Sequence, residues 1–274
     1  MKKLLAGFLC VCLALSIVGC GSPADSDAGT TVPSISGKDV SANNASAPAQ
    51  DGTVSRSMNA LALPSTTEEV YSNDHTLLFT LSSQNVSIDL DNDVLEELII
   101  SDLQSRTGDT LSEADQICRD AWSDQPEHPN WSNYFLNVSY TPTRLDQVLL
   151  SLFRNDVSYS GGAHPFVYTD SVTYDLQTGA ALELQDIFRS DYSQDVLCAL
   201  VLKALDGKSE ELSYNYQEIV TGQFSEENEI KKDWYFSKNG LCFHFSPYEI
   251  APYSSGTIIA EIPYEELQGI LLER

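Results

Sequence analysis

The residues best suited to chemistry or ligand contact lie in residues 158–165, which read Ser-Tyr-Ser-Gly-Gly-Ala-His-Pro. Gly161 and Gly162 allow backbone angles that other residues avoid, and Pro165 lacks the N–H group that a strand ladder requires. The segment therefore predicts a tight corner between two strands, with His164 at its tip. Two interpretations stay open: a structural turn whose histidine bonds locally, or a lip that faces a ligand, since loops on a rigid scaffold often carry function.

A second pair of interest is Cys242 and His244, which would project from one face of a strand because strand side chains alternate. Together with His164 they would supply three metal-ligating side chains. The sequence offers no fourth, and metal ions in proteins are usually held by a fuller set of ligands. We therefore interpret Cys242 and His244 as packing residues, and we predict no metal ion or other cofactor.

Catalysis by carboxylates is not indicated by the close acidic pairs of the chain. These pairs are Glu68 with Glu69, Glu96 with Glu97, and Glu265 with Glu266, and they arise by chance among 40 acidic residues. Neighbours in sequence do not face each other on a helix, and glycoside hydrolysis needs two carboxylates at a defined spatial separation. The Gly-x-Ser-x-Gly elbow of serine hydrolases is absent. We predict a protein without enzymatic activity, with a peptidoglycan-acting enzyme as the alternative.

Aromatic residues are frequent in the C-terminal third, where Trp234, Phe236 and Tyr264 occur. Most would be core, but tyrosine and tryptophan also suit interfaces, because they combine a large area with a polar tip. We expect exposed rings in the loop at residues 247–253. The sequence thus predicts a ligand-binding surface from two irregular segments, formed by Tyr159, Gly161, Gly162, His164, Pro247, Tyr248 and Tyr253.

The composition narrows the class of partner. The 274 residues include 40 acidic and 15 basic side chains, spread along the chain, for a net charge of −25. Nucleic acid is an unsuitable partner, because phosphate binding needs a basic footprint. A basic protein or solvated cations fit this charge, and plain solubility is the alternative explanation.

The first 20 residues predict a targeting segment. Lys2 and Lys3 precede an apolar run, residues 4–18, that is too short for a stable spanning helix. The run ends in Ile-Val-Gly-Cys at residues 17–20, which resembles the lipobox of bacterial lipoproteins. That resemblance implies cleavage before Cys20, lipidation of its thiol and a mature net charge of −27. We expect an extracytoplasmic lipoprotein anchored at the bacterial cell surface; an ordinary secretory signal is the alternative.

The chain after the signal is expected to comprise a linker and one domain. Residues 21–69 are polar, contain no aromatic residue and predict a disordered tether. Residues 70–274 predict the folded domain, with an N-terminal part at 70–142 and a C-terminal part at 143–274. Its remaining cysteines, Cys118, Cys198 and Cys242, allow one disulfide or buried free thiols.

The elements predicted within this domain alternate irregularly between strands and helices. Strands are expected at 75–81, 133–141, 148–157, 166–176, 180–184 and 257–262, with a hairpin at 234–246 that turns at Asn239 and Gly240. Helices are expected at 92–103, with Asn92 as N-cap, and at 112–122, 192–205, 209–220 and 264–272. This order predicts an α+β fold, a mixed or antiparallel sheet with helices packed on one side.

Two groups of segments resemble one known domain. They are residues 159–164 (Tyr-Ser-Gly-Gly-Ala-His), 172–179 (Val-Thr-Tyr-Asp-Leu-Gln-Thr-Gly) and 184–188 (Leu-Gln-Asp-Ile-Phe), and then 240–253 with Gly256, Ile262 and Pro263. These resemble the extracytoplasmic domain shared by RsiV-type anti-sigma factors and PdaC-type peptidoglycan deacetylases. In the RsiV-type members the resemblance implies binding of lysozyme at the cell surface.

The resemblance does not extend to the activities of those larger proteins. We find neither a deacetylase domain nor a sigma-binding segment beside a membrane helix, so we expect neither activity here. The expected function is that of a lipid-anchored binding module of the cell envelope. Its expected partner is lysozyme or another basic protein, and the alternative partner is cell-wall glycan such as peptidoglycan.

Anchoring through Cys20 is directly testable. The Cys20→Ala protein should be released from the membrane fraction, because it lacks the thiol that would carry the lipid. Fractionation and labelling with a fatty-acid analogue measure this. A Cys20→Ala protein that stays in the membrane fraction and still carries label would contradict the lipobox interpretation.

Overall fold

The computed structural model describes residues 60–224 and 232–272, which all belong to one compact unit. The signal segment and most of the predicted linker lie outside the described residues. Within the described ranges, no helix combines the length and the apolar character needed to cross a bilayer. The α+β fold class predicted from the sequence is confirmed, with a mixed sheet and an antiparallel one.

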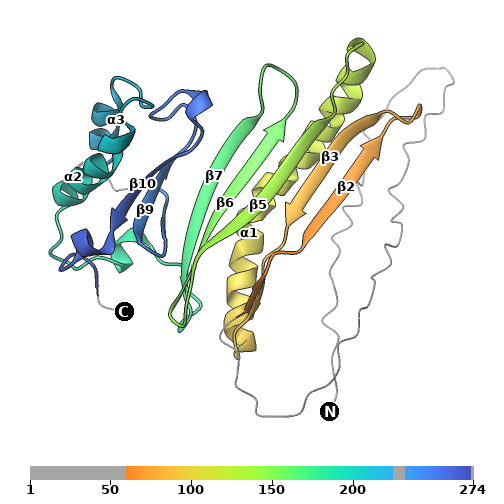
Figure 1. Cartoon of the computed structure of the whole chain (residues 1–274). Coiled ribbons are helices and arrows are strands. Elements are labelled where there is room, and N and C mark those ends of the chain that lie inside the picture. The colour runs from red at the N-terminus through yellow and green to blue at the C-terminus, as the bar shows by residue number, and fades with distance from the viewer. Residues whose placement is uncertain (1–59, 225–231, 273–274) are drawn as a thin grey trace, which may run out of the picture. The chain divides into compact units, whose positions relative to one another are not determined.

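The larger sheet has five strands in the order β2-β3-β5-β6-β7 (Figure 1). The pair β3–β5 is parallel and the other pairs are antiparallel. A small two-stranded sheet pairs β1 with β4. The strands are β1 (Ala60–Ala62), β2 (Ser65–Tyr71), β3 (Leu77–Gln84), β4 (Ser87–Asp89), β5 (Tyr134–Leu145), β6 (Leu149–Tyr159) and β7 (Phe166–Asp175).

Helix α1 (Asp93–Asp124) makes the crossover between the parallel strands and covers one face of this sheet (Figure 1). It starts where the sequence predicts, because the Asn92 side chain accepts hydrogen bonds from the backbone of Val94 and Leu95. Its buried stripe includes Ile99, Leu103 and Ala121, which pack against Leu136, Leu150 and Tyr174 of the sheet.

The smaller sheet is antiparallel, in the order β10-β9-β8, and has its own core. Its elements are α2 (Gln194–Leu205), α3 (Tyr216–Gln223), β8 (Trp234–Phe236), β9 (Gly240–Phe245) and β10 (Ile258–Pro263). Helices α2 and α3 lie beside this sheet (Figure 1), and Val201 and Val220 share its core with Phe243. Helix α1 thus packs on the larger sheet and helices α2 and α3 pack on the smaller one, whereas the sequence predicted a single sheet.

Several predicted boundaries were wrong. The predicted linker runs to residue 69, but β1 begins at Ala60 and β2 at Ser65, and the polar residues of β2 pair with β3 as an exposed edge strand. The two predicted helices at 92–103 and 112–122 form one continuous helix, since Gly108 is tolerated within it.

Three predicted elements near the C-terminal part are shorter than expected. The run at 180–184 makes only a bridge from Ala181 to Tyr174, and the helix expected at 209–220 begins at Tyr216. The closing helix is a single 3₁₀ turn, Tyr264–Leu267, because Pro263 still belongs to β10. The alternatives for Cys118, Cys198 and Cys242 were one disulfide or free thiols. In the structure all three are free thiols, with no disulfide among them.

The predicted hairpin at 234–246 is confirmed, but its turn is shifted by one residue. Ser237 and Gly240 are joined by a backbone hydrogen bond of 2.9 Å, so the turn residues are Lys238 and Asn239. Gly240 has another purpose: a Cβ atom there would lie 2.0 Å from the carbonyl oxygen of Ile262 in β10. Glycine is therefore required for the close approach of β10 to β9.

We expect Gly240→Ala to lower the free energy of unfolding by about 3 kcal/mol or more, because the new methyl group must displace strand β10. Gly108→Ala is the matched control, since no atom outside the helix backbone lies within 4 Å of its added Cβ. That control should stabilise the protein by about 0.5–1 kcal/mol. Urea denaturation measures both, and equal stabilities for the two variants would contradict this account of Gly240.

Candidate functional site

The corner predicted at residues 158–165 connects the end of β6 to the start of β7. Gly161 and Gly162 adopt φ angles of 92° and 98°, a region that strongly favours glycine. A Cβ atom on Gly161 would lie 2.9 Å from the hydroxyl oxygen of Tyr134. Tyr159 donates a hydrogen bond of 3.1 Å to the carbonyl of Gly162 and thereby holds the corner from within.

The second predicted segment, residues 246–253, is a loop anchored by the buried Ile250. Its turn is closed by a hydrogen bond of 3.1 Å from the backbone N–H of Tyr248 to the carbonyl of Ala251. Tyr248 has a φ of 72° and a side chain that is 65% exposed. An exposed bulky residue in this strained region is a mark of functional sites.

His164 joins the two segments, which are far apart in sequence. Its Nδ1 atom lies 2.9 Å from the Pro165 carbonyl and its Nε2 atom lies 3.0 Å from the Tyr248 hydroxyl. Because a carbonyl oxygen only accepts, Nδ1 carries the hydrogen and Nε2 accepts from Tyr248. The ring of Tyr253 stacks on His164 at 3.9 Å, and its hydroxyl donates to the same Pro165 carbonyl at 2.8 Å.

We call His164, Tyr248 and Tyr253, with the loops that carry them, the aromatic corner. Of the predicted site residues, these three are in direct contact. Gly161, Gly162 and Pro247 shape the loops, and Tyr159 stacks on Phe135 within the sheet. The sequence did not suggest Phe166 and Tyr168 of β7, whose rings are 67% and 45% exposed.

The candidate metal ligands do not converge. His244 is buried between the sheets, where its Nε2 atom lies 2.9 Å from the Ser171 hydroxyl and its Nδ1 atom lies 3.1 Å from that of Thr169. The Cys242 thiol instead faces Glu261. Among residues 60–224 and 232–272, no group of three or more potential metal-ligating side chains is present.

His244 and Ser171 form a structural pair rather than a base and its nucleophile. Ser171 donates its hydroxyl hydrogen to the Trp234 carbonyl at 2.8 Å, so the Nε2 atom of His244 must be the donor to Ser171. The Nδ1 atom then accepts from Thr169, and Thr169 accepts from Ser246. Burial lowers the pKa of His244 to about 3, so the ring is neutral near pH 7.

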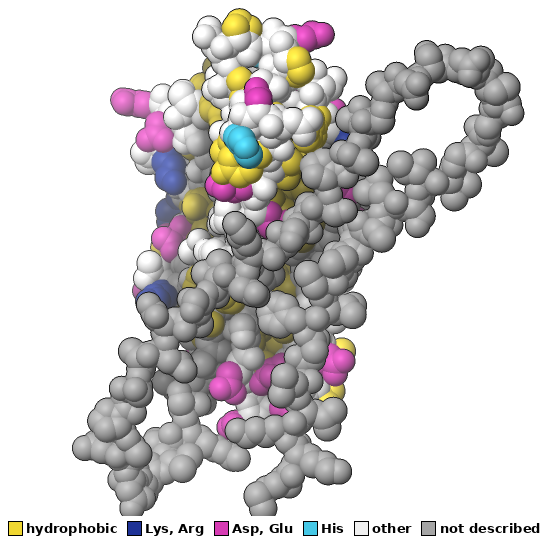
Figure 2. Space-filling model, turned by 90° about the vertical axis from the view of Figure 1, so that its right-hand side faces the viewer, with side chains coloured by type: hydrophobic (Ala, Val, Ile, Leu, Met, Phe, Trp, Pro, Cys, Tyr) yellow, Lys and Arg dark blue, Asp and Glu magenta, His cyan; other side chains and the backbone are white. Residues whose placement is uncertain are grey.

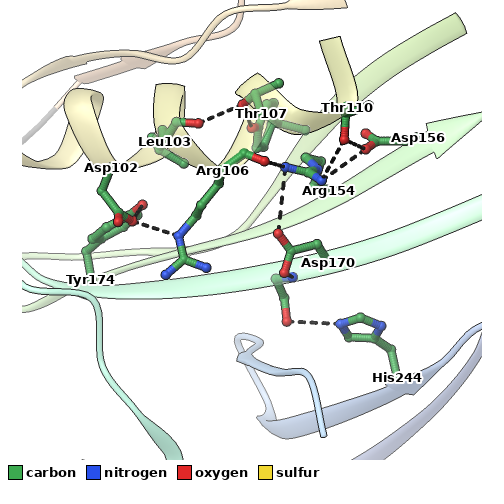
Figure 3. A network of polar contacts seen from close by, with 12 residues as sticks. Asp102, Leu103, Arg106, Thr107, Thr110, Arg154, Asp156, Asp170, Tyr174 and His244 are labelled. Atoms are coloured by element: carbon green, nitrogen blue, oxygen red, sulfur yellow. Dashed lines mark hydrogen bonds and ion pairs between the residues drawn. The ribbon is translucent and has the colours of Figure 1, made fainter. Parts of the chain in front are cut away.

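A polar network lies on the opposite face of β7, between the sheet and α1 (Figure 3). The buried Arg154 guanidinium contacts the Arg106 carbonyl at 2.7 Å and the carboxylates of Asp156 at 3.1 Å and Asp170 at 3.7 Å. Asp102 accepts from both Arg106 at 2.7 Å and Tyr174 at 2.6 Å. These contacts fix α1 on the strands and orient Asp170.

A pocket of about 260 Å³ opens where β7 meets residues 182–184 and 232–234. Its charged lining side chains are Arg106, Asp170, Glu183, Lys232 and Asp233. Burial, together with the nearby negative charges of Asp170 and Glu249, raises the pKa of Asp233 to about 6. This pocket was not predicted, because its residues come from separate elements. The one sequence signal for it is the charged pair Lys232 and Asp233 directly before the apolar strand β8.

The comparisons with known proteins support the fold. Residues 185–265 match a protein family described as "Protein of unknown function (DUF3298)". This match includes α2, α3, the smaller sheet and the loop of Tyr248, but not His164. No curated protein shows significant similarity to the chain.

Two solved structures resemble most of the chain. A DUF3298 family member from Bacteroides fragilis is 19% identical, with a TM-score of 0.58 over 78% of this chain and 94% of that one. A DUF3298 family protein from Pseudomonas aeruginosa is 16% identical, with a TM-score of 0.51 and the same coverage of both chains. At such identities the likeness concerns the fold alone.

The raised pKa of Asp233 gives a prediction for stability. A carboxylate with a folded pKa of about 6 and an ordinary value of 3.8 destabilises the fold above pH 6, and this cost disappears as the pH falls toward 3.8. Asp233→Asn should therefore raise the free energy of unfolding by about 2 kcal/mol at pH 7 and by almost nothing at pH 4.

Urea denaturation at both pH values measures the Asp233→Asn effect. Asp191→Asn is the control, because Asp191 is an exposed carboxylate paired only with the exposed Arg189. A stabilisation by Asp233→Asn that is equal at pH 7 and pH 4 would show that the carboxylate's charge is not its source.

Proposed function

We propose that this chain is a lipid-anchored binding module of the bacterial cell envelope that captures a basic protein through the aromatic corner. One observation carries the proposal: His164, Tyr248 and Tyr253 come from two irregular loops and meet at the surface. Loops fixed on strands present such side chains with little loss of conformational entropy on binding. Tyrosine rings with polar tips are typical anchors of interfaces.

The charge of the chain supports a basic partner. On the face drawn in Figure 2, acidic side chains are scattered over the surface that the grey atoms leave visible, and basic side chains are fewer. With a net charge of −25, long-range attraction would raise the rate of association with a cationic protein. Because salt screens this attraction over about 10 Å at 0.1 M, the association rate should fall as salt is added.

Lysozyme is the first candidate partner, because residues 159–164 and 240–253 resemble the RsiV-type domain. The resembling segments include both loops of the aromatic corner. Cell-wall glycan is the second candidate, and the exposed rings of Tyr248 and Phe166 favour it, since flat rings can stack on sugars. We propose no enzymatic activity, because the hydrogen of Ser171 is committed to a carbonyl and His244 cannot serve as its base.

Binding should depend on Tyr248. Tyr248→Asn keeps a residue that tolerates the left-handed backbone but removes the ring and the bond to His164. We expect it to weaken lysozyme binding by more than about 1 kcal/mol, mainly through faster dissociation. Tyr71→Asn is the matched control, because Tyr71 is 44% exposed and lies on β2, the edge strand of the larger sheet opposite to β7.

Surface plasmon resonance at low salt measures these rates, and circular dichroism checks that each variant is folded. Failure of the folded wild-type protein to bind lysozyme would overturn the lysozyme assignment, and a parallel pull-down with purified peptidoglycan then tests the glycan candidate. Equal weakening by the Tyr248 and Tyr71 substitutions would overturn the aromatic corner as the binding surface.

A further inference from the structure

Of the carboxylates that line the pocket, Asp170 is paired with Arg154 and Glu183 accepts a hydrogen bond from the backbone. Asp233, in contrast, has no direct side-chain partner among the described residues and is balanced only in part by the nearby charges of Lys232 and Arg106. Lys232 is bound to Glu249 by contacts of 2.7 and 2.9 Å, and the Arg106 Nε atom is bound to Asp102 at 2.7 Å. Asp233 accepts no side-chain hydrogen bond and forms no ion pair within the described part of the chain.

The surroundings of the pocket carry an excess of negative charge. Three cations, Arg106, Arg154 and Lys232, lie in or next to it. They are outnumbered by the carboxylates of Asp102, Asp156, Asp170, Glu183, Asp233 and Glu249. Since each cation is already paired with a carboxylate, the pocket attracts a further positive charge.

We propose that this pocket binds an organic cation, a guanidinium or primary ammonium group, with Asp233 as its principal counter-ion and Asp170 beside it. The volume of about 260 Å³ is below the range typical for drug-sized ligands, so it suits a head group on a slender arm. A metal ion is a poorer match, because the described residues provide no cluster of three ligands.

The cation has a natural source in the partner protein, and in this respect the inference rests on the proposed function. Phe166, Tyr168 and Asp170 lie on one face of β7, and the stretch from Phe166, two residues after His164, to Asp170 at the pocket spans about 13 Å. Glu249, which holds Lys232 at the pocket, directly follows Tyr248. A basic protein seated on the corner can therefore place an arginine or lysine side chain in the pocket.

The test uses small cations and the full chain. Nα-acetyl-arginine amide is titrated into the ¹⁵N-labelled protein, with the neutral isostere Nα-acetyl-citrulline amide as control. Saturable shifts of the Asp170, Asp233 and Trp234 amide signals are expected with the arginine probe and not with the citrulline probe. No saturable shift with the arginine probe, or equal shifts with both probes, would overturn the proposal.

Asp233→Asn should weaken binding of the arginine probe at least tenfold, whereas Asp191→Asn should leave it unchanged. The Asp233 variant is expected to be more stable than the wild type at pH 7, so loss of binding is not a result of unfolding. Unchanged affinity in the Asp233→Asn protein would overturn the role of this carboxylate.

Two further measurements separate the source of the cation and the two proposals. Competition between lysozyme and the arginine probe would assign the cation to a side chain of the partner. Simultaneous binding of lysozyme and the probe, or displacement of the probe by spermidine but not by lysozyme, would overturn that assignment in favour of a free small cation. Tyr248→Asn should weaken lysozyme binding and leave probe binding intact. Probe binding by a protein that ignores lysozyme would refute the proposed function and preserve the pocket.

Discussion

The structure depends on a chain of hydrogen bonds that joins the two sheets across a polar seam. It runs in one direction from the Ser246 hydroxyl to Thr169, His244, Ser171 and finally the Trp234 carbonyl. Thr169, His244 and Ser171 each donate and accept one hydrogen bond in this series, so the buried polar atoms of these three side chains are all satisfied. The neutral ring of His244 suits its place in the series, because one ring nitrogen accepts a hydrogen bond and the other donates one.

This seam is also what places the candidate site. Ser246 is the first residue of the loop of Tyr248, directly after β9, and Thr169 lies three residues after the start of β7. Bonding the two fixes the Tyr248 loop over the β6–β7 corner, where His164 can reach it. The seam also places Asp233, whose backbone carbonyl accepts from the His244 N–H at 3.3 Å, beside the edge of β7. Burial of the Asp233 carboxylate there, without a direct partner in residues 60–224 and 232–272, lowers the stability of the fold. Such a cost is common at binding sites.

Local patterns account for what could be predicted from the sequence. The Asn92 cap, the Gly161–Gly162 corner and the hairpin before Gly240 each follow from one residue and its neighbours. The single α1 helix was predicted as two, because Ser112 with Asp115 suggested the start of a second helix, whereas packing of Ile99 through Ala121 on the sheet overrides that weak local preference. The exposed β2 strand was missed because pairing with β3, rather than apolar content, holds it.

The site itself was predictable in its parts but not in its assembly. His164 and Tyr248 were identified as candidates separately, yet their contact joins residues 84 apart and depends on how the sheets meet. One sequence signal does point to the seam: Thr169, Ser171 and Thr173 alternate with larger residues, which indicates a strand face that is buried but polar. Such a face needs polar partners from another element, and His244 is the only histidine of the apolar strand β9. A match between the hydroxyl-lined face of β7 and His244 of β9 would have indicated that the two sheets pack together. The loop before β7 and the loop after β9 would then have been expected to meet at the aromatic corner.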